Sequence, residues 1–292
     1  MANLYIKAGF KEGKSYLLDS YVSVPFRITN VGQVKDDGSL YMMLGSSSPG
    51  LLDSDNHEIE IDIEKNSRFQ LQTQSYQRLY NMKKGSAQIT KISLDPNSFF
   101  CYVPHPVVPQ ENSIFRNRTV INLDKNCELI LSEVVTCGRK NSENIYPNKK
   151  ISGEIFKFTY FQNVTEIYFN DLLILKDKII LEPKVHSVNT VIQLEEYTHQ
   201  ATFIYMNTKS VDGVCELIEK VLEIIKNERN ISFGISEMAT NGFVLRVLGN
   251  GGEQLFNCFQ QIKDFLWEGK EDSVSSDKDK ACGFYSSYQE II

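Results

Sequence analysis

The sequence predicts a mainly β fold of layered sheets, with two helices in a small C-terminal α+β layer. Three observations support this prediction. Apolar and polar residues alternate in short runs through the first two hundred positions, the pattern of half-buried strands. Glycine, asparagine, aspartate and proline interrupt these runs about every eight to twelve residues, the rhythm of a sandwich or layered sheet. Two later segments instead show helical spacing of their apolar residues.

The clearest predicted strands are residues 58–63, 69–72, 88–92 and 155–160, each with a period of two. Successive side chains of a strand point to opposite faces, so each run offers one apolar face to a core. We find no fixed-period repeat in the sequence, and pattern alone therefore does not predict a solenoid.

The helical segments are expected at about residues 212–228 and 252–267. Their apolar residues recur three and four positions apart: Val214, Leu217, Ile218, Val221, Leu222 and Ile225, then Leu255, Phe259, Ile262 and Leu266. Asp212 is the expected N-cap of the first helix, and Asn241-Gly242 predicts a hairpin between the two. The chain thus divides into a β-rich body (1–200), an α+β layer packed on the same domain (201–269) and a flexible polar tail (270–292).

Composition excludes several classes of protein. Among 292 residues, 41% are hydrophobic and 23% charged, and the net charge is −6, which argues against nucleic-acid binding because phosphate contacts need a basic face. No apolar run reaches the roughly 20 residues of a membrane span. The N-terminus lacks an export signal, so a cytoplasmic protein with reduced cysteines is expected.

Residues 8–15, AGFKEGKS, nearly fit a phosphate-binding loop. Such a loop needs a buried strand before it, small residues within it and a helix after it. Here bulky residues fill the loop, and an extended stretch ending at Pro25 follows. No nucleotide site is predicted, and the scattered histidines (57, 105, 186 and 199) give no nucleophile–base pair.

The segment 102–139 is the most distinctive of the chain. Pro104, Pro106 and Pro109 lead to a basic strand at 115–119, a polar turn follows at 124–126, and a second strand at 128–135 ends before Gly138-Arg139. This order predicts a hairpin. Arg116 and Arg118 would share one face of its first strand, within reach of a cross-strand pair with Glu133.

These residues resemble the urease accessory protein family UreD/UreH. The resemblance rests on the proline-bounded opening, the F-R-x-R-T strand and the G-R ending, and on three further segments in the family's order: residues 72–80, which include Thr73, 172–183 and 242–250. It covers roughly residues 13–268, with several independent anchors. The resemblance implies a mainly β fold of stacked sheets, β-helix-like or sandwich-like, with two helices.

For function, the resemblance implies a scaffold in urease maturation that is not an enzyme. Such a scaffold bridges apo-urease to UreF and, through UreF, to UreG, and a dimer of these heterocomplexes is one arrangement that the resemblance allows. It binds no cofactor stably and passes Ni²⁺ in transit along an internal path. The alternative left open is a β-rich binding or chaperone module unrelated to nickel.

The same resemblance suggests path residues without naming a confident ligand set. Its acidic positions correspond to Glu133 and to Asp177, which replaces the usual glutamate. Its entrance corresponds to Asp55 if one insertion is allowed, or to His57 without it. A solvated turn before the strand at 58–63 is the plainer interpretation of Asp55 and His57. The structural or functional motif positions Thr73, Arg116, Arg118, Gly138 and Arg139 are further candidates.

Overall fold

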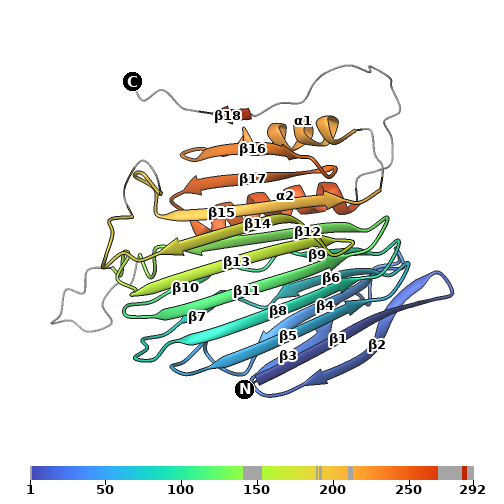
Figure 1. Ribbon diagram of the computed structural model, residues 1–292, viewed down its shortest axis with the longest axis horizontal. Helices are drawn as coiled ribbons and strands as arrows, with labels where there is room; N and C mark the ends of the chain where they lie inside the picture. The colour runs from blue at the N-terminus through green and yellow to red at the C-terminus, as the bar shows by residue number, and fades with distance from the viewer. Residues whose placement is uncertain are drawn as a thin grey trace.

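Two β-sheets and two helices form the part of the chain that the computed structural model describes, residues 2–140, 153–188, 190, 193–209, 213–268 and 285–287. The prediction of a mainly β protein with two helices near the C-terminus is confirmed. Figure 1 shows the N-terminal strands at one end of the molecule and the helices at the other. The expected N-cap Asp212, and most of the expected tail, lie outside the described residues.

Sheet A has seven strands in the order β14-β13-β11-β8-β5-β1-β2. Their bounds are β1 (Ala2–Lys11), β2 (Lys14–Val22), β5 (Asn56–Ile63), β8 (Ser86–Leu94), β11 (Ile114–Leu123), β13 (Tyr160–Phe169) and β14 (Leu172–Leu181).

Sheet B has eleven strands. Nine follow the order β18-β16-β17-β15-β12-β9-β6-β4-β3, and β7 and β10 pair beside β12. Their bounds are β3 (Phe26–Asn30), β4 (Leu40–Ser46), β6 (Arg68–Thr73), β7 (Gln77–Leu79), β9 (Phe99–Tyr102), β10 (Val107–Pro109), β12 (Glu128–Thr136), β15 (His199–Asn207), β16 (Ser232–Met238), β17 (Gly242–Gly249) and β18 (Tyr285–Ser287). The helices are α1 (Val214–Ile225) and α2 (Gly252–Glu268).

The chain winds between the two sheets as a parallel solenoid. From β4 to β13 the chain crosses back and forth between the sheets, with the short strands β7 and β10 following β6 and β9 in sheet B. From β5 on, each of these strands except β7 pairs in parallel with a strand one coil earlier. The arrangement is therefore β-helix-like in its winding and sandwich-like in its two facing sheets. Parallel sheets need such crossovers, because a tight turn joins only antiparallel neighbours.

One corner of the solenoid is a stack of asparagines. Asn66, Asn97 and Asn126 have positive φ angles of 65°, 62° and 61°, a conformation that asparagine tolerates better than most residues. Asn97 Nδ2 donates to Asn66 Oδ1 at 3.2 Å, and Asn126 Nδ2 donates to Asn97 Oδ1 at 3.0 Å. The asparagines recur roughly 30 residues apart, the repeat length of a solenoid coil.

A row of isoleucines forms the centre of the core between the sheets. Ile6, Ile61, Ile92, Ile121 and Ile167 are register partners on five adjacent strands of sheet A. All five are at most 1% exposed, and each buried side chain of this kind contributes about 1.5–3 kcal/mol. β-Branched residues suit this position because they pack well on a pleated surface.

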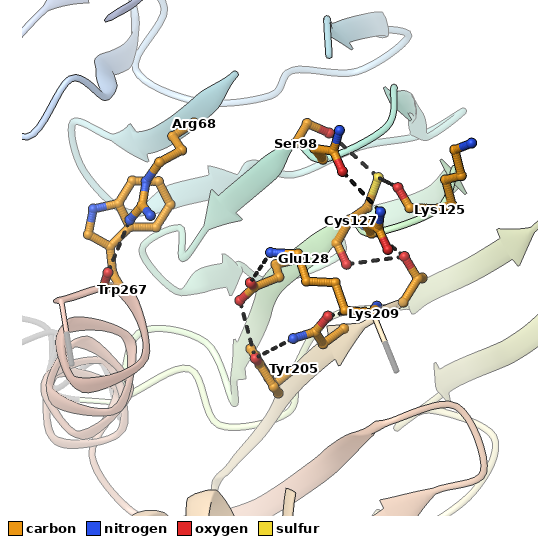
Figure 2. Close-up of polar contacts among 12 residues, drawn as sticks. Arg68, Ser98, Lys125, Cys127, Glu128, Tyr205, Lys209 and Trp267 are labelled. Atoms are coloured by element: carbon orange, nitrogen blue, oxygen red, sulfur yellow. Dashed lines mark hydrogen bonds and ion pairs between the residues drawn. The ribbon is translucent and has the colours of Figure 1, made fainter. Parts of the chain in front are cut away.

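The helices cover the other face of sheet B. Their apolar stripes join a second core that includes Phe203, Phe243 and Phe259. At the end of α2 the guanidinium of Arg68 lies over the rings of Phe99 and Trp267 and donates to the Trp267 carbonyl at 3.2 Å. Figure 2 shows this contact beside the buried Glu128, which accepts from Lys209 Nζ at 3.1 Å and from the Tyr205 hydroxyl at 3.3 Å. None of the described helices is long and apolar enough to cross a membrane.

The predicted hairpin at residues 115–135 is wrong. β11 pairs with β8 and β13 in sheet A, whereas β12 pairs with β9, β10 and β15 in sheet B. The turn at 124–126 is a corner of the solenoid, because a turn signal marks a change of direction without choosing the pairing partner. The hairpin predicted at Asn241-Gly242 is confirmed, since β16 and β17 pair antiparallel around it. Residues 8–15 belong to the β1–β2 hairpin.

Candidate functional site

A cavity of about 180 Å³ lies between the two sheets. The cavity lies where the side chains that face each other between the two sheets are polar, beyond the apolar core. Its lining comes from β5, β8, β11 and β13 on one side, and from β12 and the loops that follow β4, β6 and β9 on the other. The solenoid positions this lining, because register partners on parallel strands point to the same face.

Sheet A contributes a row of polar side chains next to the isoleucine row. His57, Gln88, Asn117 and Asn163 are register partners on adjacent strands, and all four line the cavity. Thr90, Thr119 and Thr165 form the row between these residues and the isoleucines. Buried polar groups are costly without partners, and part of this row is satisfied within the protein, as where Gln88 Oε1 accepts from Gln77 Nε2 at 3.2 Å.

Glu133 meets this row from sheet B. Its Oε1 accepts from the Thr165 hydroxyl at 2.8 Å, and its Oε2 accepts from Asn163 Nδ2. Asn163 Oδ1 in turn accepts from Asn117 Nδ2 at 2.7 Å, so the amides form a chain that ends on the carboxylate. Burial raises the pKa of Glu133, and the bonds from Asn163 and Thr165 oppose that rise.

Asp177 lies near Glu133 and forms an ion pair with Arg246, a residue that the sequence analysis did not select as a site residue. Arg246 on β17 donates to Asp177 Oδ1 at 2.5 Å and links sheet B to sheet A. In sheet A, Asp177 is the register partner of Thr165. In sheet B, Thr202 is the register partner of both Arg246 and Glu133. Only 7% of the Asp177 side chain is exposed, against 50% of Arg246. The structure thus brings Glu133 and Asp177 to one region, and Arg246 neutralises the charge of Asp177.

Asp55 and His57 have separate roles in the structure. Asp55 Oδ2 accepts the backbone N–H of Leu52 at 2.7 Å and so stabilises a turn. His57 is buried in the cavity wall and packs edge-on against Phe26, with ring centroids 4.9 Å apart. Burial lowers the pKa of His57, which favours a neutral imidazole.

Thr73 and His105 lie together where the cavity lining reaches the loops after β6 and β9. Thr73 Oγ1 is 2.9 Å from His105 Nδ1 and accepts the His105 backbone N–H at 2.8 Å. Phe256 of α2 stacks on the imidazole, with ring centroids 4.3 Å apart. Sequence reasoning singled out Thr73 but not His105, because spacing along the chain says nothing about a contact between loops of successive coils.

The arginines of the central segment lie outside the cavity. Arg118 binds Glu166 through Nε at 3.0 Å and Nη2 at 2.7 Å, and Arg116 lies 4.7 Å from the centroid of the Tyr160 ring. The predicted pairing of these arginines with Glu133 is wrong, because β11 and β12 belong to different sheets. Their side chains share one face of β11, as predicted, but it is the face away from sheet B.

Gly138 and Arg139 close the loop that follows β12. Gly138 has a φ of 115°, and a Cβ there would lie 2.5 Å from the Glu154 carbonyl oxygen. Arg139 forks onto the Glu154 carboxylate through Nε, at 3.0 Å, and Nη2, which lowers the pKa of Glu154. Glycine is needed here for its φ and for close approach, and the ion pair fixes the loop after β12 to the segment around Glu154.

No group of three histidine, cysteine, aspartate or glutamate side chains within the described residues is arranged to hold a metal ion. The cavity instead offers isolated carboxylate, imidazole, hydroxyl and amide groups spread along its wall. Such an arrangement suits water and weakly held ions better than a resident metal, which needs a closed ligand set.

Comparison with known proteins identifies the family. The sequence model of the UreD urease accessory protein family matches residues 1–274. The chain is 48% identical to the urease accessory protein UreD of Flavobacterium johnsoniae over 268 residues, which is 92% of this chain and 93% of the relative. It is 32% identical to UreD of Acetivibrio thermocellus, over 91% of this chain and 97% of the relative. The chain therefore belongs to the UreD family of urease accessory proteins.

Proposed function

We propose that this protein is a non-enzymatic scaffold of urease maturation that lets Ni²⁺ pass through the cavity between its sheets toward apo-urease. Membership of the UreD family supports the role in urease maturation. The proposal that nickel passes through the cavity depends on the position of Glu133. This carboxylate faces a continuous row of neutral polar side chains inside the protein.

The lining has the chemistry of a hydrated passage. Asn117 Oδ1 and Ser132 Oγ belong to residues that line the cavity, and both atoms are buried with no hydrogen-bond partner among the described residues. Buried polar atoms of this kind in folded proteins are usually satisfied by water. A hydrated ion can then exchange one or two waters at a time for amide, hydroxyl or carboxylate oxygens, so that it never loses its whole shell.

Charge in this passage is low, which suits transit. Glu133 attracts a cation, whereas Asp177 is paired with Arg246. Two free carboxylates at this depth would hold a divalent ion tightly, since charge interactions strengthen in a low dielectric. One carboxylate among neutral ligands favours entry without trapping a borderline ion such as Ni²⁺.

The partners in the proposal are UreF, UreG acting through UreF, and apo-urease. The scaffold holds these proteins in one complex and excludes bulk water from the route of the ion. Co-expression with the cognate UreF should raise the soluble yield and give a complex that co-elutes in size-exclusion chromatography. A stable lone chain that never binds UreF would contradict this part of the proposal.

The decisive experiment replaces the two acidic residues by near-isosteric amides. Glu133→Gln, Asp177→Asn and the double variant are expressed with the urease genes, and nickel content and urease activity are measured beside a UreF pull-down. Each single change should lower nickel loading while the complex still forms. The double variant should be less than additive if both residues act on one route.

Glu166→Gln is the matched control. Glu166 is a buried carboxylate on the same strand as Asn163, but it faces Arg118 and Lys176 outside the cavity. Its loss should leave nickel loading unchanged. Normal loading by the double Glu133/Asp177 variant would remove these residues from the route and favour a binding module unrelated to nickel. Loss of the pull-down would assign them to structure.

A further inference from the structure

His105 is an imidazole held in a fixed position at the cavity wall, and nothing in the proposed route yet uses it. It follows β9 in a loop whose residues Pro104 and His105 line the cavity together with Thr73 and Tyr76. This loop joins β9 to β10 within sheet B, and the chain then crosses to β11 of sheet A.

Three neighbours fix the ring. Thr73 Oγ1 lies 2.9 Å from Nδ1 and also accepts the backbone N–H of the same histidine, so the side chain and its backbone are tied to one atom. Phe256 stacks on the ring at an interplanar angle of 23°, and the Tyr76 ring lies 5.9 Å away. These contacts come from β6, from the loop after it and from α2, which are far apart in the sequence.

The other ring nitrogen of this cavity-lining histidine is available to a ligand. His105 Nε2 has no hydrogen-bond partner among the described residues, whereas Nδ1 is engaged by Thr73. Histidines that bind metals share this pattern, with one nitrogen held by an oriented hydrogen bond and the other directed at the ion. His57, the other imidazole of the cavity, packs on Phe26 without a hydrogen bond to either nitrogen within the described chain, so its orientation is less constrained.

A carboxylate gives this region a negative potential. Glu253, in the first turn of α2, accepts the Tyr76 hydroxyl at 2.9 Å, and its charge favours a cation near the imidazole. Glu253 is held by that bond beside the ring cluster, so it attracts an ion to the region while the imidazole supplies the donor atom. Imidazole nitrogen suits borderline divalent ions such as Ni²⁺ better than it suits Mg²⁺ or Ca²⁺.

We propose that His105 Nε2 is a transient ligand for the divalent metal ion where the ion enters the cavity, and that Thr73 positions the ring for this contact. The inference rests on the proposed passage of nickel, because it names the point of entry into the same cavity. Water supplies the remaining ligands, since no group of three metal-binding side chains is present in the described chain. The contact is therefore weak and exchanges quickly, as transit requires.

The test of metal contact uses the full-length protein, with UreF bound if solubility demands it. Histidine ring signals and Asn163 side-chain signals are followed by nuclear magnetic resonance while NiCl₂ is added, since hydrated Ni²⁺ is paramagnetic and broadens nearby signals. His105 should broaden at the lowest nickel concentration. The exposed His186 is the matched control and should broaden last.

Two variants separate ligation from positioning. His105→Asn should raise the nickel concentration at which the Asn163 side-chain signals broaden, and should lower nickel loading of urease at limiting nickel, with recovery when nickel is raised. Thr73→Val keeps the size of the side chain but removes its hydroxyl, and should weaken the effect of nickel on His105 roughly tenfold, the usual cost of losing an orienting partner. Both variants should still bind UreF.

The outcomes distinguish the inference from the proposed function. If Asn163 broadens while His105 does not, or if His105→Asn loads urease normally at limiting nickel while Glu133→Gln does not, the entry point is wrong and the passage stands. If neither His105 nor Asn163 responds to nickel and both variants load urease normally, the passage itself is wrong, and the inference fails with it.

Discussion

Glu133 on β12 and Asn163 on β13 are hydrogen-bonded to each other across the gap between the two sheets. They are 30 residues apart in the chain and belong to different sheets, so only the winding of the solenoid brings them together. The bond ties the polar row of sheet A to the single carboxylate that sheet B contributes to it. The same contact therefore serves both the cohesion of the sheets and the chemistry of the cavity.

Removing this carboxylate should be more harmful than neutralising it. Glu133→Ala leaves Asn163 Nδ2 and the Thr165 hydroxyl without their acceptor, which costs about 1–3 kcal/mol. Glu133→Gln retains an acceptor oxygen and should cost less. Urea unfolding of the two variants measures the difference, and equal stability would mean that water replaces the carboxylate fully.

The asparagine corner can be tested at its central member. Asn97→Ala places an ordinary residue at a φ of 62° and removes both ladder hydrogen bonds, for a total of about 1–3 kcal/mol. Asn97→Gly keeps the backbone conformation available and loses only the side-chain bonds, so it should cost less. A larger loss for glycine in thermal unfolding would show that the left-handed backbone is not the main constraint.

The pH dependence of stability should include a contribution from His199. Burial lowers the pKa of this imidazole from 6.5 to about 4. Between these values the unfolded chain binds a proton that the folded protein does not, so stability falls as the pH is lowered from 6.5 toward 4. The loss approaches about 2–3 kcal/mol. His199→Gln should flatten the curve of unfolding free energy over this range, and an unchanged slope would contradict the assignment.

Gly138 should not tolerate a side chain. Gly138→Ala brings a Cβ within 2.5 Å of the Glu154 carbonyl at a φ of 115°, so the backbone strain alone costs about 1–3 kcal/mol. Gly251→Ala is the control, since the nearest atom to its Cβ lies at 3.4 Å. Thermal unfolding should separate the two variants clearly, and similar midpoints would mean that the Glu154 loop moves aside freely.

The segment around Lys14 should not bind nucleotides. It forms the turn of the β1–β2 hairpin, and Lys14 Nζ lies 3.4 Å from the Asp36 carboxylate. A phosphate cradle needs backbone N–H groups at the start of a helix. Calorimetry with GTP should give no heat of binding for the native protein or for Lys14→Ala. Micromolar binding that depends on Lys14 would overturn this prediction.

The sequence was sufficient to predict most of the elements that local periodicity defines. The strand predicted at residues 155–160 is wrong, because this segment is a loop up to Tyr160, where β13 begins. The alternation at residues 58–63 predicted β5, and the helical spacing from Val214 predicted α1. Both predictions were possible because one face of each element is buried, so its apolar residues recur at a regular interval along the chain. The hairpin at Asn241-Gly242 was predicted because a short turn fixes its own pairing; the turn has three residues, 239–241, with Asn241 at a φ of 40°.

Pairing between coils could not be predicted in the same way. The sequence signal that repeats from coil to coil is short: an acidic residue lies two positions before each of Asn66, Asn97 and Asn126. The number of residues between successive signals is not constant. A turn at 124–126 looks the same whether the next strand returns beside the first or crosses to the other sheet. The contact of Arg246 with Asp177 depends on that order of strands, and it was missed for this reason.

The alternation of strands between two sheets has a consequence during synthesis on the ribosome. From β4 to β12 no strand pairs with its immediate successor, so each new strand can pair on one side with the earlier coil while its other edge waits for the next coil. At 5–20 residues per second, a coil of roughly 30 residues takes several seconds to appear. For that time a parallel edge stays open to other chains. The moment at which a partner protein is made should therefore matter as much as its amount.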